Sequence, residues 1–129
     1  MMFEDVIRER TATRSFKNKK VEKEKIIKIL EAGRLAPTAK NKQPQKIIVV
    51  TSDEGLNKID TISPCRYNAQ TVLVVCSNKD IAFKMDNYST YEIDACIVAT
   101  HMMLEATNLG IDNIWIEMFD KKKLKQVFN

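Results

Sequence analysis

Two arginines four residues apart are the side chains best suited to chemistry in this chain of 129 residues. Arg10 and Arg14 flank Thr11, Ala12 and Thr13 in the segment RTATRSF. A guanidinium keeps its charge at all ordinary pH values and presents several donors in one plane, which suits phosphate and other anionic groups. We therefore expect an anion site at this segment.

A polar loop follows one amphipathic helix later. Residues 35–44 read LAPTAKNKQP and lead into the apolar run at 47–50. Taken alone, the loop is typical of a helix that ends at a proline and continues as a polar turn. Together with the arginine pair, it indicates a polar loop that faces the anion site.

Alternating helices and strands must position these two segments. Apolar spacing predicts helices at residues 2–9, 22–35, 53–61, 91–109 and a lysine-rich last helix, and strands at 46–51, 71–77 and 113–118. Ser52 and Asp120 are the expected N-caps. On the first helix, Phe3, Val6 and Ile7 share one face. The second helix is expected to turn five apolar side chains inward: Ile26, Ile27, Ile29, Leu30 and Leu35.

The helix at 91–109 is apolar on nearly every side and ends before Gly110, a residue that suits the position after a helix. A single domain of this size cannot easily cover such a helix all round, so we expect part of it to pack against a second subunit. Glu92 and Asp94 are interpreted as favourable charges near its N-terminus.

Composition indicates one domain over residues 1–129, with no repeat and no linker. The three cysteines are widely spaced, so neither disulfides nor a metal site are expected, and a reducing cytoplasm fits. The net charge of +4 comes from lysines without interleaved aromatic residues, which argues against nucleic-acid binding. No export or membrane signal is visible in the sequence.

At this point the residues carry a resemblance that covers nearly the whole chain. The order RTATRSF, LAPTAKNKQP, KIIVV, VLVVC, LEATNLGI and WIEMFD resembles the nitroreductase family of FMN-dependent oxidoreductases. The resemblance implies an α+β fold, a mixed α/β sandwich with a central mixed sheet flanked by helices. It also implies a homodimer with FMN at the interface.

In the first motif, the resemblance implies that Arg10 pairs with the FMN phosphate and that Arg14 stabilises the reduced ring. Thr11 and Ala12 lie between them. Ala12 departs from the family, because it lacks the hydroxyl that a serine would offer to the phosphate. A hydrogen bond to a charged group is worth roughly 1.5–3 kcal/mol, so FMN affinity is expected to fall. Thr11 or Thr13 could substitute only after a backbone shift.

In the second motif, the resemblance implies that Pro37, Thr38, Ala39 and Asn41 belong to a loop that reaches the partner subunit's flavin. In the third, the backbone at Glu117 and Met118 would approach flavin N5. Met118 departs from the glycine of relatives, and its side chain would either line the ring pocket or partly fill it.

The implied activity is two-electron transfer from NAD(P)H through the flavin to a nitroaromatic, a quinone or a similar acceptor, with no dedicated catalytic acid or base. Compared with the family, the chain stops before a further strand and a C-terminal arm. Together with Ala12 and Met118, this leaves a second hypothesis open: a degenerate, non-catalytic family member that binds flavin weakly or acts as a regulatory dimer.

Overall fold

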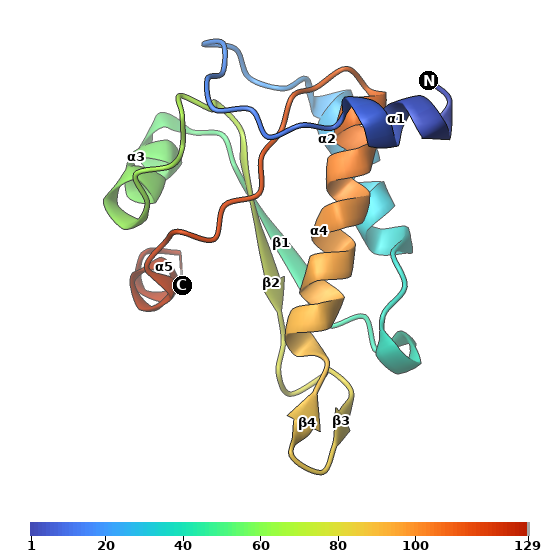
Figure 1. The fold of residues 1–129 in the computed structure, drawn as a ribbon. Helices are drawn as coiled ribbons and strands as arrows, with labels where there is room; N and C mark the ends of the chain where they lie inside the picture. Colours follow the sequence, from blue (N-terminus) through green and yellow to red (C-terminus); the bar gives the residue numbers. More distant parts are fainter. Residues whose placement is uncertain (129) are drawn as a thin grey trace.

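The computed structural model describes residues 1–128. Its centre is an antiparallel pair of strands, β1 (Gln45–Val50) and β2 (Val72–Ser77), which are in register from Gln45 opposite Ser77 to Val50 opposite Val72. Helices cover both faces of this pair (Figure 1). The expected α+β class is confirmed.

Two helices, α2 (Lys23–Leu35) and α4 (Tyr91–Asn108), form the layer on one face, and α1 (Phe3–Glu9) packs against α4. Their buried side chains meet Ile47, Leu73 and Val75 of the strands. Gly33 permits the close approach of α2 to α4, because a Cβ at this position would lie 2.8 Å from the sulfur of Met102.

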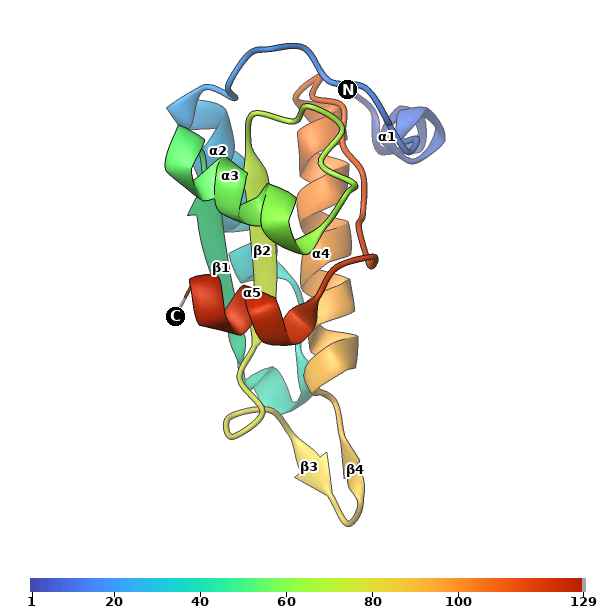
Figure 2. The same ribbon diagram turned by 90° about the vertical axis from the view of Figure 1, so that its left-hand side faces the viewer.

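The opposite face is covered by α3 (Asp53–Ile62) and α5 (Lys121–Val127), as Figure 2 shows. Here Leu56, Ile59 and Ile62 pack with the strand residues that alternate with those of the first face: Ile48, Val50, Val72 and Val74. Alternate side chains of a strand point to opposite faces, so each strand contributes to both clusters. The stretches 47–50 of β1 and 72–76 of β2 are therefore apolar on both faces.

The predicted caps are confirmed. Ser52 Oγ accepts the Gly55 N–H at 3.0 Å, Asp120 Oδ1 accepts the Lys123 N–H at 3.0 Å, and Gly110 follows α4 with a φ of +74°. A short 3₁₀ turn, η1 (Ala39–Asn41), and a hairpin of β3 (Lys84–Met85) and β4 (Tyr88–Ser89) complete the elements.

The strand predicted at 113–118 is wrong. Within residues 1–128 this segment makes only an isolated parallel bridge, between Asn113 and Ala12. Nearby backbone groups bond to other elements instead: Met118 O accepts Ser63 Oγ, and Asp120 N donates to Ile62 O. The apolar residues of 113–118 belong to an extended segment that packs beside helices and does not pair in a sheet.

The expected inward faces of the first two helices are partly wrong. Ile29 of α2 is buried, but Ile27 and Leu35 are exposed in this single chain. On α1, Val6 is buried while Phe3 and Ile7 remain exposed. The apolar stripe that each helix buries against its neighbours is narrower than the apolar stripe in its sequence. The remaining apolar side chains therefore lie on the surface.

Candidate functional site

Backbone hydrogen bonds hold the arginine-bearing segment at two points. Thr13 N donates to Asn113 O at 3.1 Å, and Phe16 N donates to Tyr67 O at 3.1 Å. Asn68 Nδ2 also donates to Phe16 O at 3.1 Å. These contacts fix the extended segment against two loops that are distant in the sequence.

The two guanidinium groups on this segment have no partner in the described part of the chain. Arg10 is half-buried and Arg14 is exposed, and neither side chain makes a hydrogen bond or ion pair with residues 1–128. Two guanidinium groups without ionic partners, carried on a fixed backbone, are suited to bind an anion. The backbone that carries both guanidinium groups is therefore held in place, while the anion site itself remains a prediction.

Thr11 faces away from this site. It lines a hollow of about 180 Å³ at the C-terminal end of α4, together with Glu9, Thr107, Gly110, Ile111, Asp112 and Asn113. Neighbouring side chains of an extended segment point to opposite sides, so Ala12 and Arg10 lie on the other side from Thr11. From this backbone, Thr11 does not supply the hydroxyl that is missing at Ala12.

A buried carboxylate holds the second motif. Asp94 in the first turn of α4 is only 1% exposed. Its Oδ1 accepts the Ala39 N–H at 3.0 Å, and its Oδ2 accepts the Thr90 hydroxyl at 2.9 Å. Thr38 Oγ1 closes the loop by accepting the Gln43 N–H at 3.0 Å. The loop is thus attached to the start of α4.

This loop has an unusual backbone. Lys40, Asn41 and Gln43 have φ values of +57°, +52° and +50°. Left-handed backbone costs a residue with a Cβ about 1–2 kcal/mol. Such strain persists where surrounding contacts determine the conformation, and it gathers at functional segments. Pro37 and Asn41 are exposed on this loop, while Thr38 and Ala39 are half-buried.

The first two motifs lie at opposite ends of α4. Ala39 is bonded to Asp94 in the first turn. Thr13 is bonded to Asn113, whose side chain reaches Thr107 in the last turn. Asp94 and Thr107 are thirteen positions apart on this helix, which at 1.5 Å per residue is roughly 20 Å. Figure 1 shows the η1 turn and the N-terminal segment at opposite ends of α4. The polar loop therefore does not face the anion site of its own chain.

The third motif is held by Ser63. The Ser63 hydroxyl donates to Met118 O at 2.8 Å and accepts the Cys65 N–H at 3.1 Å. The backbone N–H groups of Glu117 and Met118 make no hydrogen bond within the described residues. Met118 is 67% exposed in this single chain, and its expected place beside the flavin ring remains a prediction.

One ion pair stabilises the loop that contacts Phe16. Arg66 donates to both carboxylate oxygens of Asp60 at 2.7 Å, and this hydrogen bonding lowers the pKa of Asp60. Arg66 also donates to Ala69 O at 2.9 Å. Arg66 thus joins Asp60 at the end of α3 to Ala69 on the far side of Tyr67, and so supports the arginine segment indirectly.

Sequence reasoning missed the residues that hold the three motifs. The sequence indicates only a favourable charge near the N-terminus of α4 for Asp94. However, Asp94 shares a helix face with Val98, Met102 and Ala106, all of which are buried. An acidic residue in a buried stripe was the available signal. Ser63 and Asn113 gave no comparable signal, because their partners are backbone groups far away in the sequence.

Other sites find no support in the described part of the chain. It contains no group of three or more histidine, cysteine or acidic side chains able to hold a metal ion. None of its helices is both long and apolar enough to cross a membrane. Burial raises the pKa of the Cys76 thiol, which disfavours the reactive thiolate.

The sequence and the structure of this chain are similar to those of known proteins. The family model described as Nitroreductase family matches residues 7–65 and 62–129. A curated protein of Archaeoglobus fulgidus, provisionally named NADH dehydrogenase/NAD(P)H nitroreductase, is 30% identical over 117 residues, which cover 88% of this chain and 66% of the relative. This chain thus spans just under two thirds of that protein's length.

Solved structures share the fold. A crystal structure of a nitroreductase family protein from Clostridium difficile matches with a TM-score of 0.95 at 37% identity, covering 99% of this chain and 75% of that one. A protein of Exiguobacterium sibiricum solved in complex with FMN matches with a TM-score of 0.89 over 99% of this chain and 80% of that one. At 20% identity, this second likeness shows the fold alone. The fold expected from the motifs is confirmed.

Proposed function

We propose that this chain, which belongs to the nitroreductase family, is an FMN-dependent oxidoreductase that uses NAD(P)H to reduce nitroaromatic compounds, quinones or similar electron-poor acceptors. The observation that carries the proposal is the arginine segment, whose two guanidinium groups have no partner among residues 1–128 while its backbone is fixed by Asn113 and Tyr67. FMN, when bound, supplies the two-electron chemistry.

The residues present fit FMN. Arg10 would bind the phosphate, since a guanidinium matches phosphate geometry. Arg14 would stabilise negative charge on the reduced ring. The free N–H groups of Glu117 and Met118 would donate hydrogen bonds to the ring edge. The chain itself therefore binds, orients and tunes the cofactor, and it needs no acidic or basic side chain for proton transfer.

A homodimer belongs to the same proposal. The Pro37, Thr38, Ala39 and Asn41 loop lies at the opposite end of α4 from Arg10, so this loop would meet the flavin of a second subunit. Exposed apolar side chains support such an interface, because Ile93, Leu35 and Phe3 leave apolar surface that a second subunit could cover. Each flavin site would then combine arginines of one subunit with the loop of its partner.

The proposal is tested by purifying the protein without added flavin and recording its visible spectrum. We expect a yellow flavin band that bleaches when NADH or NADPH is added. In matched variants, Arg10→Ala should lower the flavin content, whereas Arg14→Ala should keep the flavin and slow its reduction. If both variants lose flavin equally and reduction rates per flavin stay unchanged, the two roles assigned to the arginines are wrong.

The second candidate function is a degenerate family member that regulates or carries flavin without catalysis. Ala12 favours it, because Ala12 has no hydroxyl and the neighbouring Thr11 lines the hollow at the end of α4 instead. A protein that stays colourless after incubation with excess FMN and gel filtration would establish this alternative. Ala12→Ser is then expected to increase FMN binding by roughly tenfold, the value of one hydrogen bond to a charged group.

A further inference from the structure

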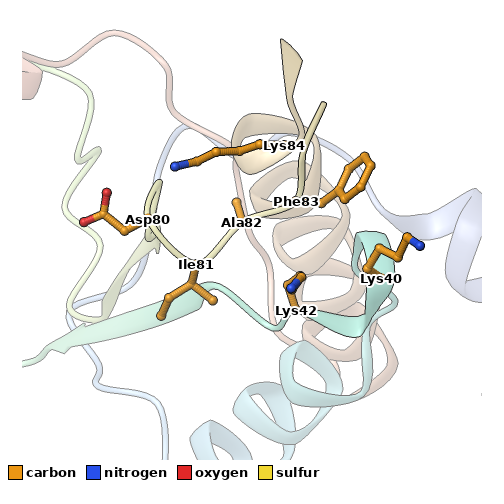
Figure 3. Close-up of a pocket in the computed structure, with 7 residues that line it drawn as sticks. All are labelled: Lys40, Lys42, Asp80, Ile81, Ala82, Phe83 and Lys84. Carbon is orange, nitrogen blue, oxygen red and sulfur yellow. The ribbon is translucent and has the colours of Figure 1, made fainter. Parts of the chain in front are cut away.

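A basic depression of about 430 Å³ lies beside the 37–43 loop, at the end of the molecule that carries β3 and β4. Its lining comes from two walls that are distant in sequence (Figure 3): Lys40 and Lys42 on one side, and Asp80, Ile81, Ala82, Phe83 and Lys84 on the other. It is separate from the arginine segment, which lies at the other end of α4.

The depression has an excess of positive charge. Lys40, Lys42 and Lys84 oppose only Asp80 among its lining residues. None of the three ammonium groups makes an ion pair or hydrogen bond with any residue from 1 to 128. Three unpaired cations around one concave surface favour a ligand that carries more than one negative charge.

Buried hydrogen bonds join the two walls. Asp94 accepts the N–H of Ala39, which precedes Lys40, at 3.0 Å, and it accepts the Thr90 hydroxyl at 2.9 Å. Thr90 N in turn donates to Phe83 O at 3.1 Å. Asp94 and Thr90 are 1% and 4% exposed. The lysines of the two walls are thus held on one rigid base, which lowers the ordering cost of binding.

Phe83 adds a feature that a simple phosphate site would not need. Its side chain is half-buried, and in Figure 3 its ring stands at the edge of the depression on the side of Lys40. An aromatic face stacks on a purine ring, and lysines bind phosphates as mobile point charges. An adenosine that carries phosphate groups combines both requirements.

We propose that this depression binds the adenosine-phosphate half of the pyridine dinucleotide that reduces the enzyme. The inference rests on the proposed function, because it assigns a subsite to NADH or NADPH. The position of the depression supports the inference as well. The depression adjoins the loop that would lie next to the partner subunit's flavin, so a dinucleotide held here would extend toward that ring.

The first test compares two double variants that remove the same positive charge. Lys42→Ala/Lys84→Ala alters the depression, and Lys28→Ala/Lys122→Ala alters exposed lysines on α2 and α5. We expect the first pair to raise the KM for the dinucleotide by roughly tenfold, with a smaller change in kcat and unchanged flavin content. A KM raised for NADPH alone indicates that the lysines bind the 2′-phosphate. A KM raised for both dinucleotides indicates that they bind the diphosphate.

The second test needs no flavin chemistry. Titration calorimetry with adenosine 2′,5′-bisphosphate should show binding that Lys42→Ala/Lys84→Ala abolishes and Lys28→Ala/Lys122→Ala retains. Phe83→Leu should weaken binding of this nucleotide but leave binding of inorganic pyrophosphate unchanged. Unchanged binding of both probes to Phe83→Leu would instead assign the site to phosphate groups alone, and equal losses would show that Phe83 only shapes the depression; either result overturns the adenosine part of the proposal.

The outcomes separate this inference from the proposed function. If the flavin is reduced normally but both lysine pairs show the same KM, the depression is not the dinucleotide subsite while the enzyme assignment stands. If no flavin is bound, the proposed function fails and calorimetry alone decides whether the depression takes the nucleotide. Absence of nucleotide binding to the unaltered protein overturns the inference.

Discussion

The carboxylate of Asp94 lies 3.0 Å from the backbone nitrogen of Ala39 and is almost completely shielded from water. A buried carboxylate is stable only when its oxygens are hydrogen-bonded, and here the second oxygen receives the Thr90 hydroxyl. This relationship connects the core helix α4 to the loop that would contact the flavin, so loop geometry depends on a residue outside the motifs.

Replacing Asp94 is expected to destabilise the protein and loosen the loop. Asp94→Ala leaves the Ala39 N–H and Thr90 hydroxyl unpaired, which should cost about 2–4 kcal/mol of unfolding free energy. Asp94→Asn keeps an acceptor for Ala39 and should recover part of that stability. Urea unfolding measures the free energy, and trypsin cleavage after Lys40 and Lys42 measures loop opening. Wild-type cleavage rates in Asp94→Ala would contradict this role.

The Asp60–Arg66 pair predicts a pH dependence of stability. The folded-state pKa of Asp60 is lowered by Arg66, so the contribution of the pair is fully present above the unfolded pKa of about 4 and disappears as the pH falls through the folded pKa. Because the Asp60 side chain is 45% exposed, solvent screening limits the contribution of the pair to the free energy of unfolding to about 1 kcal/mol or less.

The corresponding measurement is urea unfolding of Asp60→Asn and the unaltered protein at several pH values. Their free energies should differ at pH 7 and converge in acid. Glu54→Gln serves as a control, since the Glu54 carboxylate pairs with Lys58 at 3.6 Å on an exposed helix surface and contributes little. A difference for Asp60→Asn that persists at pH 2 would have another origin.

Ser63→Ala should release the third motif. The substitution removes the hydrogen bond to Met118 O and the acceptor for Cys65 N, at a cost of about 1–2 kcal/mol. Trp115, the single tryptophan, lies in the same segment and is 37% exposed. Its fluorescence should shift to longer wavelength and become easier to quench with acrylamide. Thr61→Ala, which removes only a bond within α3, should leave the emission unchanged.

Mixed dimers should reveal the shared site. In the proposed homodimer, Arg10→Ala and Asn41→Ala would each produce two defective flavin sites. A mixed dimer of the two variants would contain one site with both defects and one with none, so about half of the flavin content and activity should return. Differently tagged, co-expressed chains provide the material. A mixed dimer with no more flavin than either homodimer would show that each site is built from one chain.

The secondary structure was largely predictable, because it depends on neighbouring residues. Periodic apolar positions indicated α2, α3, α4, β1 and β2, and the Ser52 and Asp120 caps are confirmed in their expected places. The segment at 113–118 misled the prediction, since an apolar run has the same appearance whether its backbone pairs in a sheet or bonds to a helix end.

By itself, the sequence determined the family and the chemical groups available, since Arg10, Arg14 and the PTAKN loop identify themselves by type and spacing. Only the tertiary structure decided that α4 separates these motifs by its own length and that Asp94, Asn113 and Ser63 hold them. The physical reason is that residue type and local spacing set a side chain's chemistry and local backbone, whereas a hydrogen bond such as that of Ser63 to Met118 depends on how distant segments pack.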